Sequence, residues 1–469
     1  MTMTMTMAMM TPLLPQISKA WEVAVPYQRE DALFAARRKR VVLGHKTGLG
    51  KTFISLLAWS QWPDINKVLI LGTTPSVGTW KRIIAQWGGG ETTIMQGSGD
   101  PAWNDVVKKG HPGIWLCTYA TFRLLIKSLP MGKHLPIDLF ICDELHKALR
   151  NRTQTWKDCK RVDSKYFIGA TATWASKGPQ DLFPVLNMID HRTHSSYWKF
   201  VETWCLVNDG SFGKEIIGVK NASNLKQMLR REYYATRTWK EVGVQFLGKE
   251  MATEPIVRRT EYIDMSSEHN ALYYTMQNSM EVHYKGDFIL AQNSLSKLTL
   301  CLQLALSPQL LFPKAPVGSA VEWLCERLME LESAVVFIPY KGLAGITAKY
   351  LHSLGYGKEI YSLYGGVSVD DCNATITEWK QRKGVVFCTV AYAQSFALDA
   401  SDYAFFLGFD WDPNNNIQAE GRMRRFDSDF SVPCLATYIV VVNTVYEAVK
   451  DVINGKIDNV RKVLAGYGL

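Results

Sequence analysis

Five short apolar runs in the first 171 residues constrain the fold of this chain more than any other feature. They are rich in β-branched, leucine and aromatic residues and lie at 40–44, 67–74, 114–119, 137–144 and 166–171. Short runs that are apolar throughout are typical of strands buried on both faces. Longer stretches that suit helices lie between them. The alternation predicts an α/β fold with a doubly wound parallel sheet.

The same alternation returns towards the C-terminus, with strand-like runs at 334–339, 384–389, 403–409 and 436–442. The residues between the two regions contain few strand-like runs and many helical ones. A chain of 469 residues is also too long for a single ordinary core, so two to three domains are expected. We therefore predict α/β lobes at 1–177 and 311–469, with a mainly helical protrusion at 178–310.

A glycine-rich stretch, GHKTGLGKT at 44–52, follows the first apolar run and precedes a helical pattern. Glycines let the backbone wrap so that N–H groups point at phosphate oxygens, and the helix N-terminus adds a partial positive charge. This strand–loop–helix context is the one that a P-loop requires, although His45 stands where the strict pattern has glycine. The alternative is a glycine-rich turn with a surface lysine.

If the stretch is a P-loop, its residues have defined roles in binding ATP and Mg²⁺. We expect Lys51 to reach the β- and γ-phosphates and the Thr52 hydroxyl to bind Mg²⁺. The loop residues that would surround the phosphates are Thr47, Gly48, Leu49 and Gly50.

Two adjacent acids, Asp143 and Glu144, end the apolar run at 137–144. In a P-loop protein, an aspartate at the end of a strand can hold Mg²⁺, and the next carboxylate can polarise the water that attacks the γ-phosphate. His146 would couple this site to the following loop. Taken alone, such a pair is usually part of a solvated loop.

An arginine-rich stretch near the C-terminus, QAEGRMRRFD at 418–427, places Gln418, Arg422 and Arg425 at offsets of four and seven. These offsets predict one face of a helix. A solvated basic helix is the ordinary alternative, but hydrolysis of ATP also needs a cation that stabilises the γ-phosphate, and arginine suits that role. Since Lys51 lies in the other lobe, we expect ATP to draw the two lobes together.

Taken together, these motifs resemble those of the superfamily 2 helicases, and within them the SNF2-like DNA translocases. The resemblance covers about residues 20–455 and rests on motifs in family order. They are PYQ (26–28), GLGKT (48–52), TTPSVGTWKRIIAQW (73–87), DELH (143–146), GATAT (169–173), DLFPVLNMI (181–189), FDWDPNNNIQAEGRMRR (409–425) and TYIVVVNTVYEAV (437–449).

The resemblance implies RecA-like lobes and further site residues. Gln28 would recognise adenine, and Gln418 would belong to the nucleotide site. By motif position, Ser76, Thr118 and Thr389 would contact the DNA backbone. The chain looks like a minimal motor of the kind found in bacteria and phages, which implies a cytoplasmic location.

Two departures from the family pattern concern the second lobe. Residues 389–400 lack the glycines of the family's motif V, and RFDS follows where the family has glycine and glutamine. The first departure bears on how DNA contact is linked to ATP.

The composition agrees with a nucleic-acid partner without requiring one. Lys and Arg outnumber Asp and Glu by 53 to 44, a net charge of +9. Basic clusters at 36–40, 230–234 and 257–259 are either solvated surface or salt-sensitive DNA contacts. No apolar run approaches the ~18 residues of a membrane span, so we expect no membrane partner. The nine cysteines form no C-x-x-C pair, which favours buried, reduced thiols.

Three functions therefore stay open. The first is an ATP-driven translocase that tracks along DNA or separates or anneals its strands. The second is an ATP-gated clamp with slow turnover, which would recruit a nuclease or a replication or recombination protein. The third, ranked lower, is a motor on RNA.

Overall fold

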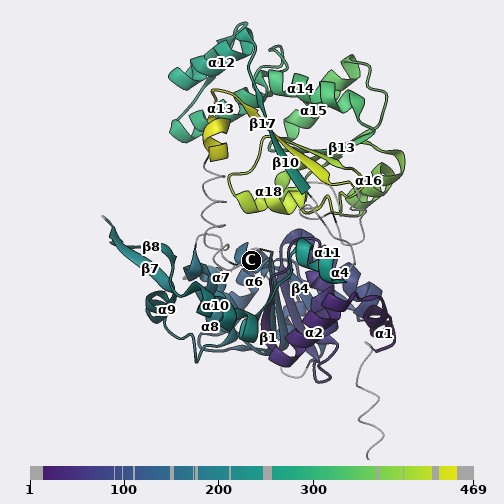
Figure 1. The fold of residues 1–469 in the computed structure, drawn as a ribbon, viewed down its shortest axis with the longest axis vertical. Coiled ribbons are helices and arrows are strands. Elements are labelled where there is room, and N and C mark those ends of the chain that lie inside the picture. The colour runs from purple at the N-terminus through teal and green to yellow at the C-terminus, as the bar shows by residue number, and fades with distance from the viewer. Residues whose placement is uncertain are drawn as a thin grey trace, which may run out of the picture. The chain divides into compact units, whose positions relative to one another are not determined.

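The computed structural model describes residues 14–88, 90–97, 99–108, 111–147, 153–172, 174, 178–210, 213–246, 256–365, 369–393, 396–424 and 432–451. These residues fall into two compact units, one ending at 246 and the other beginning at 256. Each unit contains its own parallel sheet with helices around it (Figure 1), which confirms the predicted α/β class with two lobes.

The sheet of the first unit has seven strands in the order β3-β4-β2-β5-β6-β1-β9, and each neighbouring pair is parallel. The strands are β1 (Arg40–Leu43), β2 (Lys67–Gly72), β3 (Thr92–Ile94), β4 (Gly113–Thr118), β5 (Leu135–Asp143), β6 (Val162–Ala170) and β9 (Tyr234–Ala235). The five predicted runs form β1, β2, β4, β5 and β6. The edge strands β3 and β9 are too short to give a sequence pattern.

Helices cover both faces of this sheet, which explains why its strands are apolar throughout. Val41 and Leu43 pack against one helical layer, whereas Val42 between them packs against the other. The first layer contains α1 (Leu14–Val23), α2 (Pro26–Arg38), α3 (Lys51–Trp59), α4 (Thr74–Ile83) and α11 (Trp239–Phe246). The second contains α5 (Ala102–Val107), α6 (Tyr119–Leu125), α7 (Gln154–Cys159), α8 (Phe183–Ile189), α9 (Tyr197–Trp204) and α10 (Ala222–Met228). Figure 1 shows α2 and α4 on one side of the strands and α7, α8 and α10 on the other.

Residues 178–310, expected as a protrusion of their own, are divided between the two units. Helices α8 to α11 pack on the first sheet because each is too short to form a core alone; Phe200 of α9 and Leu225 of α10, for example, are buried in the first unit. The stretch also contains two antiparallel hairpins that the sequence did not indicate. They are β7 (Cys205–Gly210) with β8 (Gly213–Val219), and β11 (Glu281–Tyr284) with β12 (Asp287–Leu290).

The second unit has a six-stranded sheet in the order β10-β17-β16-β13-β15-β14, again parallel at each pair. Its strands are β10 (Ile256–Ile263), β13 (Ser333–Ile338), β14 (Ile360–Leu363), β15 (Gly384–Thr389), β16 (Tyr403–Leu407) and β17 (Cys434–Val441). Its helices are α12 (Ser267–Asn278), α13 (Ser294–Leu306), α14 (Ser319–Glu330), α15 (Lys341–Ser353), α16 (Val369–Arg382), α17 (Val390–Ala393) and α18 (Pro413–Glu420). Strand β10 comes from the segment that we had placed in the protrusion.

The cysteines agree with the expectation of reduced thiols: all nine lie among the described residues, are buried and form no disulfide. Burial raises the pKa of Cys205 and Cys325 to about 12, so these thiols stay protonated. Within the described ranges, no helix combines the length and the apolar character needed to cross a membrane.

Candidate nucleotide site

The glycine loop joins the end of β1 to the start of α3, as the sequence predicted. Gly48 and Gly50 adopt φ values of 88° and 75°, in the left-handed region that glycine tolerates best. A side chain at Gly50 would also place its Cβ 2.7 Å from Nε2 of Gln28. The loop therefore needs glycine at position 50 for both its backbone and its packing.

Gln28 lies on α2 directly against this loop and is almost completely buried. Its Oε1 accepts a hydrogen bond from the Val25 backbone N–H at 3.2 Å. Its Nε2 lies 3.4 Å from the hydroxyl of Tyr27, which in turn donates to the Leu49 carbonyl at 3.1 Å. The structure thus brings the predicted adenine-recognition residue together with the predicted phosphate loop.

Lys51 begins α3 and connects the loop to the acidic pair. Its ammonium donates to the His45 carbonyl at 3.0 Å. It is also near enough to Asp143 to favour the charged form of that carboxylate. Thr52 follows Lys51 in the first turn of the helix, where backbone N–H groups have no partner within the helix.

A buried cluster that sequence analysis missed supports the first half of the loop. His45 is completely buried, and its Nε2 lies 2.8 Å from Oδ2 of Asp31 on α2. Arg237 donates two hydrogen bonds of 2.9 Å to the same carboxylate and one of 3.1 Å to Glu30. The segment after β9 therefore holds α2 and the loop together.

The charges in this cluster follow from its burial and contacts. Burial works to raise the pKa of Asp31, but hydrogen bonds from His45 and Arg237 outweigh it, so the pKa lies below its ordinary value. Burial lowers the pKa of His45. Asp31 is therefore ionised and His45 neutral at neutral pH. Because an ionised carboxylate only accepts, His45 carries its proton on Nε2.

Asp143 ends β5 and is surrounded by donors. Its Oδ2 accepts hydrogen bonds from the Ser76 hydroxyl at 2.5 Å and from the indole of Trp80 at 3.1 Å, both on α4. Burial and the neighbouring charge of Glu144 raise the pKa of Asp143 despite these bonds. A carboxylate held in this way gains from a nearby cation, which the Mg²⁺ of the prediction would supply.

Glu144 adopts φ 49°, an uncommon value for a residue with a side chain, and this turns it away from the line of β5. Its Oε2 lies 3.5 Å from Nδ1 of His146, which is 2.8 Å from the hydroxyl of Thr171 at the end of β6. The structure thus shows the link that we expected from His146 to the next loop.

The two predicted DNA contacts of the first unit lie at the same edge of the sheet but already have protein partners. The hydroxyl of Ser76 is bonded to Asp143. Thr118 ends β4 and caps α6, accepting a hydrogen bond from the Thr121 N–H at 3.1 Å.

In the second unit, Gln418 and Arg422 do not lie on one helical face, so this prediction is wrong. Helix α18 ends at Glu420. The Gly421 N–H still bonds to the Ile417 carbonyl four residues back, but the Arg422 N–H bonds to the Ala419 carbonyl only three residues back. Gln418 is buried within the helix. Arg425 lies outside the described residues.

The glycine-poor segment after β15 is bonded to the arginine turn. Thr389 ends β15 and leads into the short helix α17. Further along the segment, the Leu398 N–H donates to the Arg422 carbonyl at 2.8 Å. The predicted DNA contact and the predicted arginine are thus connected within one unit.

Two other basic residues near these motifs have structural roles. Arg424 is buried and pairs with Asp402 at 2.5 Å. Arg258 of β10, in a cluster that we had considered for DNA, donates to both oxygens of buried Glu420, with its shortest bond 2.6 Å long. Tyr438 donates to the same carboxylate at 2.8 Å. These contacts fix the end of α18.

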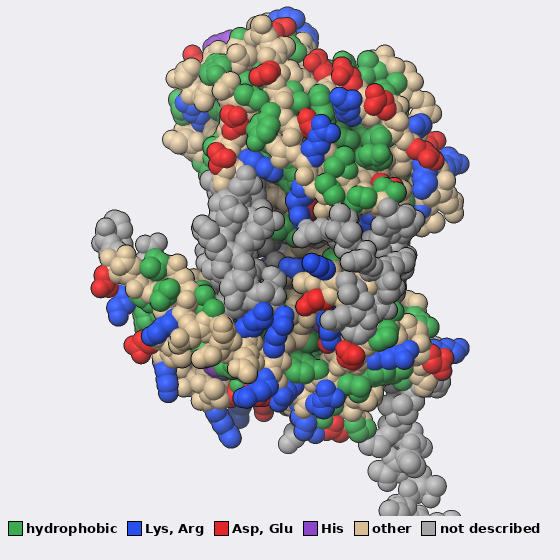
Figure 2. Space-filling model, in the orientation of Figure 1, with side chains coloured by type: hydrophobic (Ala, Val, Ile, Leu, Met, Phe, Trp, Pro, Cys, Tyr) green, Lys and Arg blue, Asp and Glu red, His purple; other side chains and the backbone are tan. Residues whose placement is uncertain are grey.

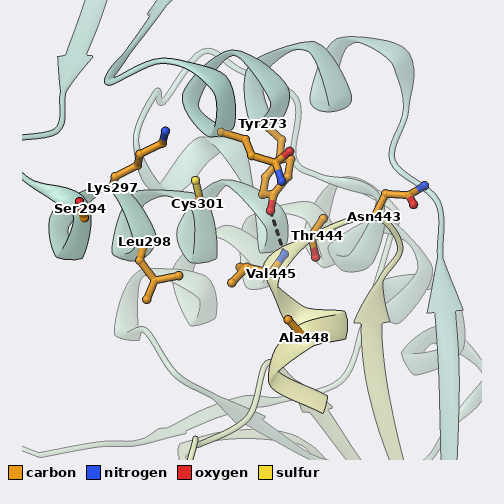
Figure 3. A pocket seen from close by; sticks show the side chains of 10 residues that line it. Tyr273, Ser294, Lys297, Leu298, Cys301, Asn443, Thr444, Val445 and Ala448 are labelled. Carbon is orange, nitrogen blue, oxygen red and sulfur yellow. Dashed lines mark hydrogen bonds between the residues drawn. The ribbon is translucent and has the colours of Figure 1, made fainter. Parts of the chain in front are cut away.

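A separate groove of about 470 Å³ opens in the second unit between α12, α13 and the turn after β17 (Figure 3). In this view Lys297 and Cys301 project from α13, and Tyr273 is bonded to the Val445 N–H. The lining includes no residue of the predicted nucleotide site, so the groove is not part of that site.

Comparison with known proteins follows the division into two lobes. A model of the SNF2-related domain matches residues 27–308, and one of the helicase conserved C-terminal domain matches residues 319–427. The SWI/SNF-related matrix-associated actin-dependent regulator of chromatin subfamily A-like protein 1 of Drosophila melanogaster is 22% identical, over 98% of this chain and 58% of its own length. The DNA repair and recombination protein RAD54B of Mus musculus is 24% identical over 47% of this chain and 27% of its own.

The chain thus spans less than two thirds of the length of these curated relatives. Among solved structures, the Sulfolobus solfataricus SWI2/SNF2 ATPase core in complex with dsDNA is 16% identical. The alignment covers 95% of this chain and 93% of that one, with a TM-score of 0.43.

Proposed function

Because the chain belongs to the SNF2-related family of superfamily 2 helicases, we propose that it is an ATP-driven translocase on duplex DNA. The observation that carries this proposal is the first unit's carboxyl edge, where Gln28 contacts the glycine loop through Tyr27. Lys51, at the end of that loop, lies near enough to Asp143 to favour the charged form of its carboxylate.

Members of this family use ATP, generally with Mg²⁺, and the residues present fit both. Backbone N–H groups of residues 47–50 and the Lys51 ammonium would hold the phosphates, and Gln28 the adenine. Thr52 and Asp143 offer the hydroxyl and carboxylate oxygens that Mg²⁺ prefers. The bound cation would neutralise charge on the phosphates.

Glu144 is the residue that we assign to polarising the attacking water, with His146 and Thr171 fixing its direction. Arg422 and Arg425 of the second unit would stabilise the negative charge that develops on the γ-phosphate, and Gln418 would support the nucleotide site from α18. The residues that bind ATP would then belong to the first unit, and those that stabilise the transition state to the second. Hydrolysis would therefore be coupled to movement of the two units.

Thr118 and Thr389 would contact phosphates of the DNA, as a motor that ignores sequence requires. Ser76 has a single O–H donor, which is bonded to Asp143. A DNA phosphate at Ser76 would therefore compete with Asp143 for that donor and connect the track directly to the metal site.

The test is the ATPase rate without DNA, with single-stranded DNA and with duplex, together with displacement of a triplex-forming strand. We expect duplex to raise the rate strongly and the triplex strand to be displaced. The Lys51→Ala variant serves as the control. It should show no DNA-stimulated ATPase activity and no displacement of the triplex-forming strand. Stimulation by RNA alone, or none by any nucleic acid, would count against the proposal.

One observation favours a second candidate, an ATP-gated DNA clamp with slow turnover. Residues 389–400 contain no glycine, and the Leu398–Arg422 bond ties this segment to the arginine turn. A stiffer segment would favour holding DNA over stepping along it. Slow hydrolysis combined with ATP-dependent retention of DNA would identify the clamp.

A further inference from the structure

The positive charge of the chain is concentrated in the first unit. Residues 1–250 contain 34 lysines and arginines against 20 aspartates and glutamates, a net charge of +14. Residues 251–469 contain 19 against 24, a net charge of −5. The net charge of +9 is therefore the sum of a strongly basic half and a weakly acidic half. A polyanion would be attracted mainly to the basic half, residues 1–250.

Many of these cations lie where the strands of the first sheet begin. Lys39 precedes β1, Lys133 lies just before β5 and Lys160 just before β6. Because the strands are parallel, their first residues share one edge of the sheet. That edge is opposite to the one that carries Asp143 and Thr118 at the strand ends.

Two buried or partly buried arginines hold further segments at this edge. Arg161 donates to the carbonyls of Ile126 and Leu129 at 2.9 and 2.6 Å, which fixes the turn that carries Lys127. Arg40 donates to the Met188 and Ile189 carbonyls at 2.8 and 3.0 Å, which fixes the end of α8 just before Arg192.

We define the amino-edge surface by six exposed cations: Arg37, Lys39, Lys127, Lys133, Lys160 and Arg192. Among the described residues, none of the six is in an ion pair. Two acids at this edge are already in ion pairs: Asp64 pairs with Lys165, and Glu232 pairs with Arg38 at 2.8 Å and with Arg231 at 2.6 Å. A third, Asp163, is exposed, and its charge acts on Arg40. Figure 2 shows Lys and Arg side chains gathered over the part of the first unit that contains α2, β1 and α8 in Figure 1.

The spacing of these cations is set by the sheet. Strands β5, β6 and β1 are neighbours, at about 4.8 Å from one to the next. The first residue of β1, Arg40, pairs with Phe167, so β6 begins five residues earlier, about 16 Å along the strand. The surface thus presents fixed charges over a distance that spans several phosphates of a duplex.

We propose that the amino-edge surface binds the backbone of a second DNA segment, so that one molecule can bridge two duplexes. The choice of DNA as the partner rests on the proposed function, whereas the surface itself lies opposite the edge that we assign to the motor. An anionic membrane is less favoured, because five of the six cations come from strand starts and turns, and only Arg37 lies on a helix, in the last turn of α2. An amphipathic helix with an apolar face to bury in lipid does not supply the other five.

The test is a capture assay with the full chain. A short biotinylated duplex is fixed on beads and loaded with protein, and capture of a fluorescent second duplex is measured at several salt concentrations. The variant K127Q/K133Q/R192Q removes three cations of the surface. The control K199Q/K314Q/K349Q removes three exposed lysines that are not among the six cations of the surface.

We expect the surface variant to lose at least about tenfold in capture, and the slope of log capture against log salt to fall by about 2.7, as for three lost phosphate contacts. The control should behave like the unaltered protein. Unchanged thermal unfolding and an unchanged ATPase rate with a single short duplex would show that the fold and the motor site are intact.

Three outcomes would overturn the inference. The first is that the unaltered protein captures no second duplex. The second is that the surface variant and the control variant lose capture equally. The third is that the surface variant loses binding to anionic phospholipid vesicles while its DNA capture is unchanged. Capture does not require hydrolysis, so it is measured in the Lys51→Ala protein as well. A chain that captured DNA but showed no DNA-stimulated ATPase would refute the proposed motor and leave the amino-edge surface standing.

Discussion

The Arg237→Met substitution gives the sharpest prediction about what holds the nucleotide site together. The arginine donates three hydrogen bonds to Asp31 and Glu30, and Asp31 is only 5% exposed. Removing one partner of a buried ion pair typically costs 3–5 kcal/mol. Because the Arg237 side chain remains 21% exposed, we expect the lower end, about 3 kcal/mol.

Thermal unfolding followed by tryptophan fluorescence suits this measurement, because 12 of the 15 tryptophans lie in residues 1–250. In a unit of this size, 1 kcal/mol shifts Tm by roughly 2–4 °C, so the fluorescence transition should fall by about 6–12 °C. Nucleotide binding should weaken as well, since the same cluster positions His45, whose carbonyl holds Lys51.

A double-mutant cycle that combines Arg237→Met with Asp31→Asn separates the energy of the ion pair from any other destabilisation caused by each substitution. The double variant should be more stable than the sum of the two single losses predicts, by more than about 0.5 kcal/mol. Additive effects, or a Tm shift below about 2 °C for Arg237→Met alone, would refute the reasoning.

The Asp31→Asn variant also predicts how the free energy of unfolding depends on pH. The folded pKa of Asp31 is depressed, so its ion pair contributes fully above the ordinary value of about 3.9 and is lost as the pH falls through the folded value. The difference in stability between the unaltered protein and Asp31→Asn should therefore be constant near neutral pH and shrink in acid. A difference that grew in acid would contradict the assignment.

Other predictions concern single contacts. Glu144→Gln should lower hydrolysis by roughly 10²–10⁴ yet bind ATP, measured by turnover and by equilibrium binding; normal turnover would disprove its role. Arg258→Met should destabilise the second unit by about 1–3 kcal/mol in calorimetry, since Glu420 is buried but Arg258 is 38% exposed, and an unchanged transition would contradict this. Gly50→Ala should abolish nucleotide binding without unfolding the chain, because φ is 75° and the new Cβ would meet Gln28; tight binding by this variant would argue against the loop geometry.

The sequence alone predicted the parts of the structure that depend on local pattern. The buried strands were identified because both faces of each are apolar. The glycine loop and the Asp143–Glu144 pair were identified because strand ends and helix starts impose short, recognisable spacings.

The contacts that could not be predicted join residues far apart in the chain. Nothing near Asp31 indicates that it pairs with Arg237, and Gly44 packs against Tyr234 so closely that an added Cβ would lie 2.0 Å from the ring. The arginine motif was placed on a continuous helix because its spacing fitted one. The structure instead ends the helix at Glu420 and forms a turn there, so the offset from Gln418 to Arg422 does not span a helical face.

Residues from the end of the first unit make hydrogen bonds to the glycine loop. This has a consequence for how the chain folds during its synthesis on the ribosome. Gly44 accepts a hydrogen bond from Tyr234, 190 positions later, and the Gly44 and Lys46 N–H groups bond to the carbonyls of Ala235 and Arg237. A growing chain on the ribosome that has not yet released residue 237 lacks these partners. The nucleotide cradle can therefore be finished only after nearly all of the first unit has left the ribosome, and until then the nascent segment depends on its own helices or on chaperones to avoid aggregation.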